Sequence, residues 1–314
     1  MIPFFGPEAI RPYLDIESLV PTAERAFCAI SDGTAQAPVY VLHPNDLADI
    51  HVKSASLPDC PIFTVKMAGW SQVLADRGEA ASSGLIAVFD SETCRPLAIL
   101  QDDHLISDYR TAAAGALVAK LLAPEDATSA LIVGSGTQAR LQAEALMMVR
   151  PIKFLRIWGR SDTAVERLVR DLQHSFPSVE ILKTGDLPSA VKQSDVIVTT
   201  TGAKEPLIRA EWVRQGQHIT SVGSDDTTKC EIDPAILKNA HVYVDAVESA
   251  LKYGAPSRAI AKGLLCKANL AELGLLIGSA GKSQVDTTVA CLSGLGVQDL
   301  TAVNGFWDKL ISSK

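Results

Sequence analysis

Short apolar runs alternate with stretches of helical spacing over the second half of this 314-residue chain. Thr163–His174 and Leu187–Lys192 place apolar residues three and four positions apart, which is typical of helices with one buried face. We predict buried strands around them, over Ala130–Val133, Phe154–Trp158, Val179–Leu182, Asp195–Thr201, Gln217–Val222 and Ala240–Val244. Strands that alternate with helices indicate βαβ units, so the predicted fold class is α/β with a Rossmann-type, doubly wound parallel sheet.

The first 120 residues have a different pattern, in which short alternating runs are bounded by Pro, Gly, Asp or Ser. These runs are Pro38–Leu42, Ile50–Lys53, Ile62–Lys66, Leu85–Phe89 and Pro96–Leu100. Closely spaced strands with turn signals favour an antiparallel or mixed sheet. The alanine-rich segment Ser107–Leu122 then predicts a long helix with Ser107 as its cap.

The change of pattern near Pro124 marks a domain boundary. We expect a mixed α+β domain over residues 1–122 and a dinucleotide-binding Rossmann domain over residues 123–285. The tail no longer fits the alternation of strands and helices, so residues 286–314 are expected to return to the first domain.

A glycine motif joins the first predicted strand of the second domain to a helix-like segment. In Gly134-x-Gly136-x-x-Ala139, the first glycine permits a tight turn, the second lets a pyrophosphate approach the backbone, and Ala139 lets helix and strand pack closely. Thr137 and Gln138 lie in the same turn, at the helix N-terminus, where free N–H groups favour phosphate. The motif predicts a bound dinucleotide. The alternative is an ordinary strand-to-helix turn.

The end of the second predicted strand, at Trp158, bears on the choice of dinucleotide. A carboxylate there would bind the adenosine ribose and repel a 2′-phosphate, but this chain has Arg160 and Ser161, with Asp162 only after the turn. A guanidinium pairs with phosphate and a hydroxyl adds a hydrogen bond. The sequence favours NADP over NAD, although a solvated arginine at a strand end gives the same pattern.

The composition agrees with a soluble enzyme. The formal net charge is −7 and the basic residues are scattered, so no nucleic-acid partner is expected. No apolar run approaches ~18 residues and no apolar segment follows a basic start, so we expect no membrane span, no signal peptide and a cytoplasmic location. The six cysteines are far apart, which favours free thiols over a disulfide framework or a metal site.

Two cations in the first domain are candidates for substrate binding. Lys66 ends an apolar run, and Arg110 lies one turn into the alanine-rich helix, among small neighbours that allow a ligand to approach. A lysine and an arginine that converge on one cleft would hold a carboxylate, because the guanidinium offers a fork and the ammonium a point charge. Lys53, on a neighbouring predicted strand, is a third candidate. Each could instead be a solvated surface charge.

Asp225 is the candidate acid or base of the second domain. It follows a glycine turn after the predicted strand Gln217–Val222, at the edge where open α/β sheets place their functional groups. A carboxylate there could hold a substrate amine or iminium and transfer its proton. The alternative is a structural cap, for which Asp226 is equally placed.

These residues, with several further motifs, resemble the ornithine cyclodeaminase/mu-crystallin family over most of the chain. Arg-Thr-Ala-Ala and Gly-Ser-Asp are the most specific of them in combination. The motifs are Val65–Lys66, Ser83–Phe89, Arg95–Ala98, Arg110–Ala114, Gly134–Ala139, Val222–Asp225 with Lys229 downstream, and Ser293–Asp299.

The resemblance implies a Rossmann domain and a substrate-binding domain that forms homodimers, with the C-terminal segment returning to the latter. It implies that Lys66 and Arg110 bind the substrate carboxylate and that Asp225, with Lys66, is catalytic. No metal is expected. The expected cofactor contacts are Gly134, Gly136, Thr137, Gln138, Ala139, Arg160, Ser161 and Thr111, together with Thr200, Thr201 and Val222 beside the nicotinamide.

One departure points away from ornithine cyclisation. Cyclising members carry an arginine shortly after the proline that matches Pro38, whereas this chain has Tyr40, which we keep as a candidate substrate contact. The ending Ser293–Asp299 resembles the branch of imine reductases and amino-acid dehydrogenases. We therefore expect NAD(P)H-dependent reduction of a small α-imino acid, such as pyrroline-2-carboxylate or iminosuccinate, to the L-amino acid. The alternatives are an ornithine cyclodeaminase that recycles NAD and a non-catalytic NADP-dependent binding protein of mu-crystallin type.

Overall fold

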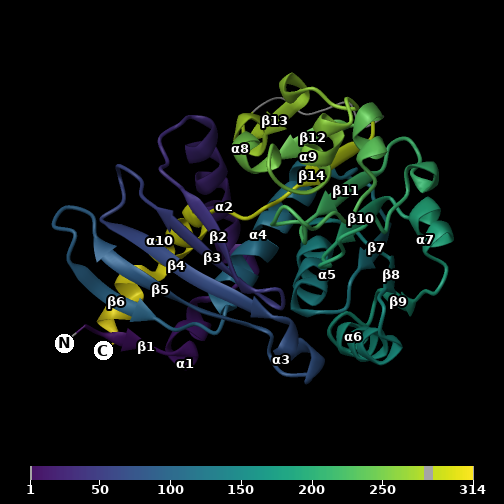
Figure 1. Ribbon diagram of the computed structural model, residues 1–314. Coiled ribbons are helices and arrows are strands. Elements are labelled where there is room, and N and C mark those ends of the chain that lie inside the picture. Colours follow the sequence, from purple (N-terminus) through teal and green to yellow (C-terminus); the bar gives the residue numbers. More distant parts are fainter. Residues whose placement is uncertain (1, 279–285, 314) are drawn as a thin grey trace. The chain divides into compact units, whose positions relative to one another are not determined.

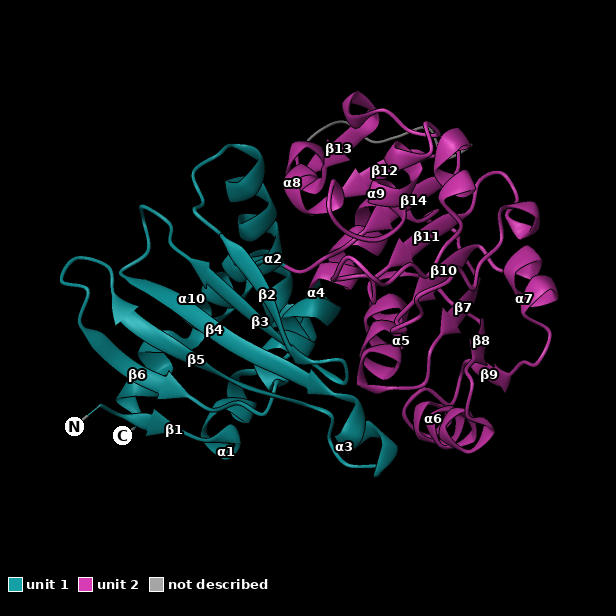
Figure 2. Ribbon diagram, in the orientation of Figure 1, with its two compact units in different colours: residues 1–113, 295–314 teal, residues 114–294 magenta. Residues whose placement is uncertain are grey.

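The computed structural model describes residues 2–278 and 286–313, and the chain divides into two compact units (Figures 1 and 2). Unit 1 contains the residues up to Ala113 and those from Leu295 onward, and unit 2 is Ala114–Gly294. Helix α4 (Leu105–Leu122) begins in unit 1 and continues into unit 2.

Unit 1 contains a mixed sheet of six strands within the described residues, in the order β1-β6-β5-β4-β3-β2. Only β1 and β6 are parallel, and the other neighbours are antiparallel. The strands are β1 (Phe4–Phe5), β2 (Val39–Asn45), β3 (Ala48–Ala55), β4 (Ile62–Ser71), β5 (Ser82–Asp90) and β6 (Pro96–Leu100). The helices are α1 (Pro7–Ile10), α2 (Ile16–Ser31), α3 (Gln72–Asp76), the start of α4, and α10 (Gly296–Ser312).

One face of this sheet is covered by helices. Helix α10 packs against α2, β3 and β4. Its first residue, Gly296, lies so close to β3 that a Cβ there would come within 2.7 Å of the Ser54 carbonyl oxygen. The C-terminal segment therefore returns to the first unit and is seated against the backbone of its sheet.

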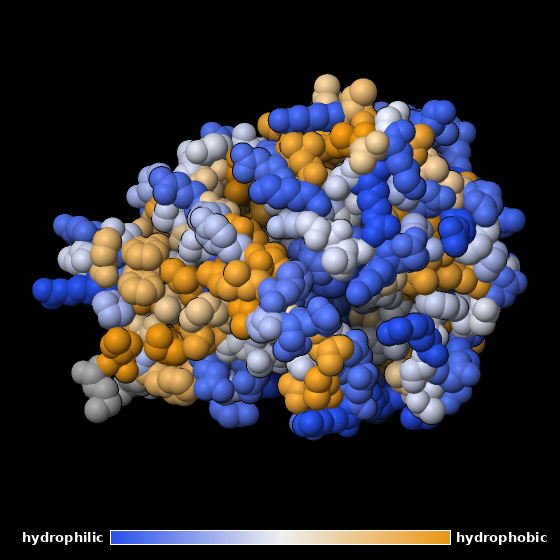
Figure 3. All heavy atoms as spheres, viewed as in Figure 1, coloured by the Kyte–Doolittle hydropathy of each residue, from blue (hydrophilic) through white to orange (hydrophobic). Residues whose placement is uncertain are grey.

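The opposite face of the sheet exposes apolar side chains. Tyr40, Val52, Met67 and Leu85 are direct partners across β2, β3, β4 and β5, so their side chains form one row. Tyr40 is 65% exposed and Met67 43%. Apolar residues gather over these strands on the left of Figure 3. An apolar sheet face of this kind commonly marks an interaction surface.

Unit 2 contains a parallel sheet of eight strands within the described residues, in the order β13-β12-β14-β11-β10-β7-β8-β9. The strands are β7 (Ser129–Val133), β8 (Phe154–Trp158), β9 (Glu180–Lys183), β10 (Val196–Thr199), β11 (His218–Ser221), β12 (His241–Val244), β13 (Leu270–Glu272) and β14 (Thr288–Cys291). The helices are the rest of α4, α5 (Thr137–Val149), α6 (Asp162–Ser175), α7 (Leu187–Gln193), α8 (Val247–Ala250) and α9 (Gly254–Ala261).

Helices bury both faces of the parallel sheet. Ala130 and Ile132 of β7 contribute to one hydrophobic core with residues of α5 and α6. Leu131 and Val133, which point the other way, contribute to a second core with residues of α7 and α9. The α/β class, with a Rossmann-type doubly wound sheet and a separate mixed sheet, is therefore confirmed.

Two local expectations differ from the structure. Strand β14 lies between β11 and β12, so the chain stays in unit 2 until Gly294 and returns to unit 1 after it, later than residue 286. Helix α4 begins at Leu105, before Ser107, and the Ile106 N–H donates to the Asp102 carboxylate at 2.7 Å. Within the described residues, no helix is both long and apolar enough to cross a membrane.

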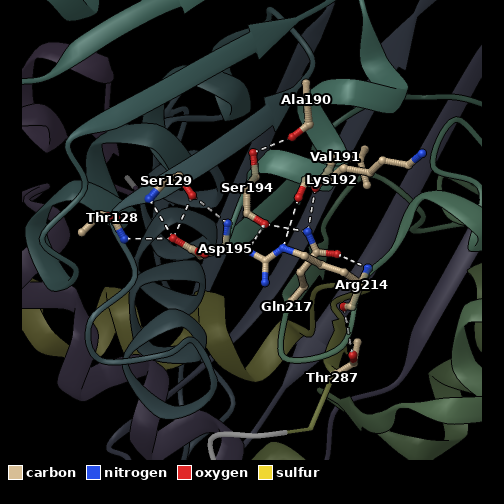
Figure 4. Close-up of polar contacts among 10 residues, drawn as sticks. All are labelled: Thr128, Ser129, Ala190, Val191, Lys192, Ser194, Asp195, Arg214, Gln217 and Thr287. Carbon is tan, nitrogen blue, oxygen red and sulfur yellow. Dashed lines mark hydrogen bonds and ion pairs between the residues drawn. The ribbon is translucent and has the colours of Figure 1, made fainter.

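A polar network joins the amino ends of several strands in unit 2 (Figure 4). The Asp195 carboxylate accepts from the N–H groups of Thr128 and Ser129, from the Ser129 hydroxyl at 2.7 Å, and from Arg214 at 2.6 Å. Buried Gln217 donates to two carbonyls at the end of α7, at 2.6 Å each, and accepts from the Arg214 N–H. We call Asp195, Arg214, Ser129 and Gln217 the Asp195 network.

Candidate active site

Two cations and one carboxylate meet inside unit 1. Lys66 of β4 and Arg110 of α4 both contact Asp299, in the first turn of α10. Lys66 Nζ lies 2.6 Å from Asp299 Oδ2, and Arg110 Nε lies 2.9 Å from Asp299 Oδ1. The three side chains are between 1% and 7% exposed. The two cations that the sequence singled out are thus buried together, and a carboxylate bridges them.

Further contacts orient both cations without using all their donors. Lys66 donates to the Ser107 hydroxyl at 2.8 Å, and Arg110 Nη1 donates to Gln298 Oε1 at 3.4 Å. An ammonium has three N–H donors and a guanidinium five. Donors therefore remain on both groups within the described residues, and these can receive an oxyanion. We call Lys66, Arg110, Asp299 and Ser107 the Lys66 cluster.

Burial and charge act in opposite directions on these groups. Burial lowers the pKa of Lys66 to about 7, although Asp299 acts against this shift. Burial alone would raise the pKa of Asp299, but Lys66 and Arg110 outweigh it and lower that pKa to about 2. A single carboxylate between two buried cations leaves the cluster with excess positive charge, which favours an anionic ligand.

The structure places Lys53 beside the cluster and Tyr40 away from it. Lys53 pairs directly with Lys66 across β3 and β4, on the face covered by α10, and is 6% exposed. Tyr40 pairs with Val52, whose side chain points to the other face because neighbouring residues of a strand alternate. Tyr40, the candidate substrate contact, therefore lies on the opposite face of the sheet from the cations. Val39, the partner of Lys53, occupies that face of β2.

The glycine motif forms the turn between β7 and α5 in unit 2. Gly134 has φ of 136°, and a Cβ there would lie 2.3 Å from the Thr200 hydroxyl oxygen, so the position requires glycine. Gly136 precedes α5 with open space around its Cα and no side-chain cap on the helix. The first N–H groups of α5, at Thr137, Gln138 and Ala139, are therefore suited to a dinucleotide phosphate.

A buried glutamate fixes the loops after β10 and β11. Glu231 accepts from the N–H and the hydroxyl of Thr201, from the Ser221 hydroxyl at 2.9 Å, and from the Gly223 N–H at 2.8 Å. Burial raises its pKa, while these hydrogen bonds act in the opposite direction. Thr200, in the first of these loops, donates to the Val133 carbonyl at 3.3 Å. Glu231 thus sets the carboxyl edge of the sheet, where the nicotinamide was expected.

Asp225 and its neighbour Asp226 have different environments. Asp226 is 3% exposed, and its carboxylate accepts from the N–H and hydroxyl of Thr228 and from the Lys229 N–H. It therefore holds the local turn, which was the structural alternative considered for this pair. The Asp225 side chain is 34% exposed and pairs with Lys229 Nζ at 2.7 Å. Asp225 is therefore the more accessible of the two carboxylates.

The remaining expected cofactor contacts lie in three places. Ser161 caps α6 by accepting from the Ala164 N–H at 3.3 Å, and Arg160 just before it is exposed. Thr111 lies on α4 in unit 1, where its hydroxyl donates to the Ser107 carbonyl at 2.7 Å. Val222 packs against the core of α5 and α6. No group of three or more potential metal ligands is present among the described residues.

Sequence reasoning missed Asp299 and Glu231 as parts of these sites. Asp299 lies within the stretch that carried the family resemblance, but it has no signal that would link it to residues 189 positions earlier. Glu231 follows Asp225 closely, in a segment with no pattern of its own. Both contacts depend on the tertiary structure.

A Rossmann-type doubly wound sheet in one unit and a mixed sheet that buries a cationic cluster in the other together indicate the class of two-unit NAD(P)-dependent oxidoreductases. Within that class, the chain belongs to the ornithine cyclodeaminase/mu-crystallin family, whose sequence model matches residues 8–314.

Three similar proteins illustrate the range of the family. An uncharacterized cyclodeaminase of Sinorhizobium fredii is 37% identical over 91% of this chain and 88% of its own. The ketimine reductase mu-crystallin of Mus musculus is 29% identical over 99% of this chain and 98% of its own. An archaeal alanine dehydrogenase, solved as a dimer with bound NAD, superposes with a TM-score of 0.90 at 26% identity, over 99% of this chain and 97% of that one.

Proposed function

We propose that this protein is an NAD(P)H-dependent reductase that converts a small α-imino acid to the L-amino acid. The observation that carries the proposal is the Lys66 cluster, in which two buried cations share one carboxylate and keep donors for another. The mouse relative is a ketimine reductase and the archaeal one an alanine dehydrogenase, so both act at a carbon bonded to nitrogen.

Lys66 and Arg110 bind the substrate carboxylate through their remaining donors, and Lys53 adds positive charge on the same face of the sheet. Holding the carboxylate fixes the imine carbon next to it. Positioning of this kind contributes several of the ~7–11 kcal/mol available from orientation.

Asp225 acts on the substrate nitrogen. Its accessible carboxylate, which Lys229 keeps oriented, stabilises the protonated iminium, and the amine formed when hydride adds to the imine carbon keeps that proton. When bound, a reduced nicotinamide supplies hydride to the imine carbon. Gly134, Gly136 and the amides of Thr137, Gln138 and Ala139 would hold its pyrophosphate, and Thr200, Thr201 and Val222 would border its ring.

NADPH is the preferred donor in this proposal. Arg160 is exposed at the end of β8, and within the described residues no carboxylate pairs with it. The Ser161 hydroxyl caps α6 and also forms a hydrogen bond with the Thr163 hydroxyl at 3.1 Å, close to Arg160. Asp162 pairs with Lys183 at 3.1 Å, so its charge is partly compensated. These contacts favour a 2′-phosphate. The cytoplasmic location stays a prediction.

A second copy of the chain covers the exposed apolar face of the sheet in unit 1. The row through Tyr40 and Met67 gives this face an apolar centre, and the similar alanine dehydrogenase is a dimer. Met67→Lys should convert the dimer to monomers in sedimentation analysis. An unchanged sedimentation coefficient would place the interface elsewhere.

The first experiment mixes the protein with NADPH or NADH and a panel of imino acids, and follows cofactor absorbance. Oxidation of NADPH in preference to NADH by a small α-imino acid is expected. Asp225→Asn should retain cofactor binding, measured by nicotinamide fluorescence, and lose most turnover. Turnover near the wild-type rate in this variant would remove Asp225 from its role.

Cyclodeamination is the second candidate, because the most identical of the three relatives is a cyclodeaminase. In that reaction, hydride leaves and returns, ornithine becomes proline, and ammonia is released with no net change in cofactor. Ammonia from ornithine, with no imine reduced, would replace the first proposal by this one. Cofactor binding with no turnover of any kind would favour a binding protein.

A further inference from the structure

Asp299 is the residue through which the two substrate-binding cations are connected. Its two oxygens contact different cations, Oδ1 that of Arg110 and Oδ2 that of Lys66. It is fully buried in the first turn of α10, where the helix dipole favours a carboxylate. A carboxylate in this position competes with the substrate for the same donors, so its presence requires a reason.

We propose that Asp299 is the positioning residue of this pair: it favours the charged form of the Lys66 ammonium and directs the remaining donors of Lys66 and Arg110 toward one substrate carboxylate. The inference deepens the proposed function and rests on it for the identity of the ligand.

The charge part of the argument concerns Lys66. The charged groups that act on it are Asp299 from α10, Arg110 from α4, Lys53 from β3 and Asp102 from the turn before α4. Ser107 of α4 adds a neutral hydroxyl. Burial, Arg110 and Lys53 all favour loss of the Lys66 proton, and Asp299 contributes the largest opposing effect. Without Asp299, Lys66 would be neutral near pH 7 and would bind a carboxylate weakly.

The geometric part concerns Arg110. Asp299 engages Nε, so the Nη groups remain for a ligand, with Nη1 only weakly held by Gln298 at 3.4 Å. The carboxylate itself cannot shift easily, because α10 starts at Gly296 against the β3 backbone. Gln298 also accepts from the Leu295 N–H at 2.8 Å, which fixes the same turn. Because Asp299 holds Nε, the edge of the Arg110 guanidinium that carries the Nη groups faces the ligand.

The test measures the Lys66 proton directly and uses L-proline as the carboxylate probe. In protein labelled with ¹³C-lysine, the Lys66 Cε resonance, assigned with Lys66→Met, is followed from pH 5 to pH 9. Binding of L-proline to the protein loaded with NADP is measured by calorimetry over the same range. Wild-type affinity should fall as pH rises through the Lys66 midpoint near 7, because the neutral amine no longer attracts the carboxylate.

Asp299→Asn removes the charge and keeps the size. The Lys66 midpoint should fall by a pH unit or more, and L-proline binding at pH 7.5 should weaken about tenfold, with the difference closing toward pH 5.5. Asp299→Glu should restore the midpoint near 7. Asp308→Asn, the same change at the exposed end of α10, should leave both readouts unchanged.

Two results would overturn the inference. One is an Asp299→Asn midpoint equal to that of the wild type. The other is a loss of L-proline affinity that is equal at every pH, as a purely structural defect would cause. Thermal unfolding of each variant identifies misfolding. If the wild type binds no L-proline, the proposed ligand class is wrong. The titration midpoint of the Lys66 resonance in the wild type and in Asp299→Asn still tests the role of Asp299.

Discussion

The Lys66 cluster and the Asp195 network each surround one carboxylate with donors, yet they have opposite properties. Asp299 contacts two long cationic side chains and lies at 1% exposure. Asp195 contacts one arginine, one hydroxyl and two backbone N–H groups, and its side chain is 28% exposed. The Lys66 cluster therefore has excess positive charge in a buried position. In the Asp195 network, the charges of Asp195 and Arg214 balance at the partly exposed edge of the sheet.

This difference separates the proposed binding site from a structural connection. In the Asp195 network, the donors come from residues at the start of β7 and from the loop before β11, and Arg214 and Gln217 also bind carbonyls at the end of α7. No charge is left over, so the network stabilises unit 2 and has no need of a ligand. Lys66 and Arg110 retain donors and charge that only a further anion satisfies. Removing a residue should accordingly affect function in one region and stability in the other.

The largest expected effect is that of Lys66→Met on catalysis. The change removes one of two carboxylate-binding cations, so kcat/KM for the imino acid should fall on the order of a thousandfold, equivalent to about 4 kcal/mol. Stability should stay level or rise, since Asp299 then pairs with Arg110 alone and one buried positive charge is removed. Steady-state kinetics and thermal unfolding measure the two quantities. A large loss of stability would mean that the cluster is structural.

Gln217→Ala should have the largest effect in the other region. It deletes three hydrogen bonds at a fully buried site and leaves a cavity, so the free energy of unfolding should fall by ~3 kcal/mol in urea titration. The kcat of the remaining folded protein should be unchanged. Gln215→Ala, at an exposed position two residues earlier, is the matched control. An equal loss in both variants would contradict the importance of the network.

Asp195→Ala should cost ~2 kcal/mol at pH 7, because partly exposed hydrogen bonds to a charged group are lost. Burial alone would raise the pKa of Asp195, but the bonds from Ser129 and Arg214 outweigh it and lower the pKa. The wild-type advantage is therefore present above the unfolded pKa and lost as pH falls through the folded one. Urea titrations at pH 7 and pH 3 should give a smaller difference at pH 3. A constant difference would mean that the charge contributes nothing.

The sequence predicted the elements of both regions more fully than their contacts. The spacing of apolar residues predicted β4, α4 and the β7–α5 turn, because this local spacing determines which face of a strand or helix is buried. Lys66 and Arg110 were recognised as cations out of place on apolar elements. Asp299 was not linked to them, since nothing local shows that the start of α10 seats on β3. The face on which Tyr40 lies could not be predicted from the sequence, because it depends on the pairing of β2 with β3.

Replacing arginine by lysine in both regions makes the finest comparison. Arg110→Lys keeps the charge but loses the paired N–H donors of the guanidinium, so KM for the imino acid should rise about tenfold, equivalent to ~1.4 kcal/mol. Arg214→Lys should lower stability by only ~0.5–1 kcal/mol, because an ammonium still reaches Asp195 and the lost carbonyl contacts lie near solvent. Its KM should not change. If the two variants behaved alike, in KM or in unfolding, the excess charge at Lys66 would not distinguish a ligand site from a structural connection.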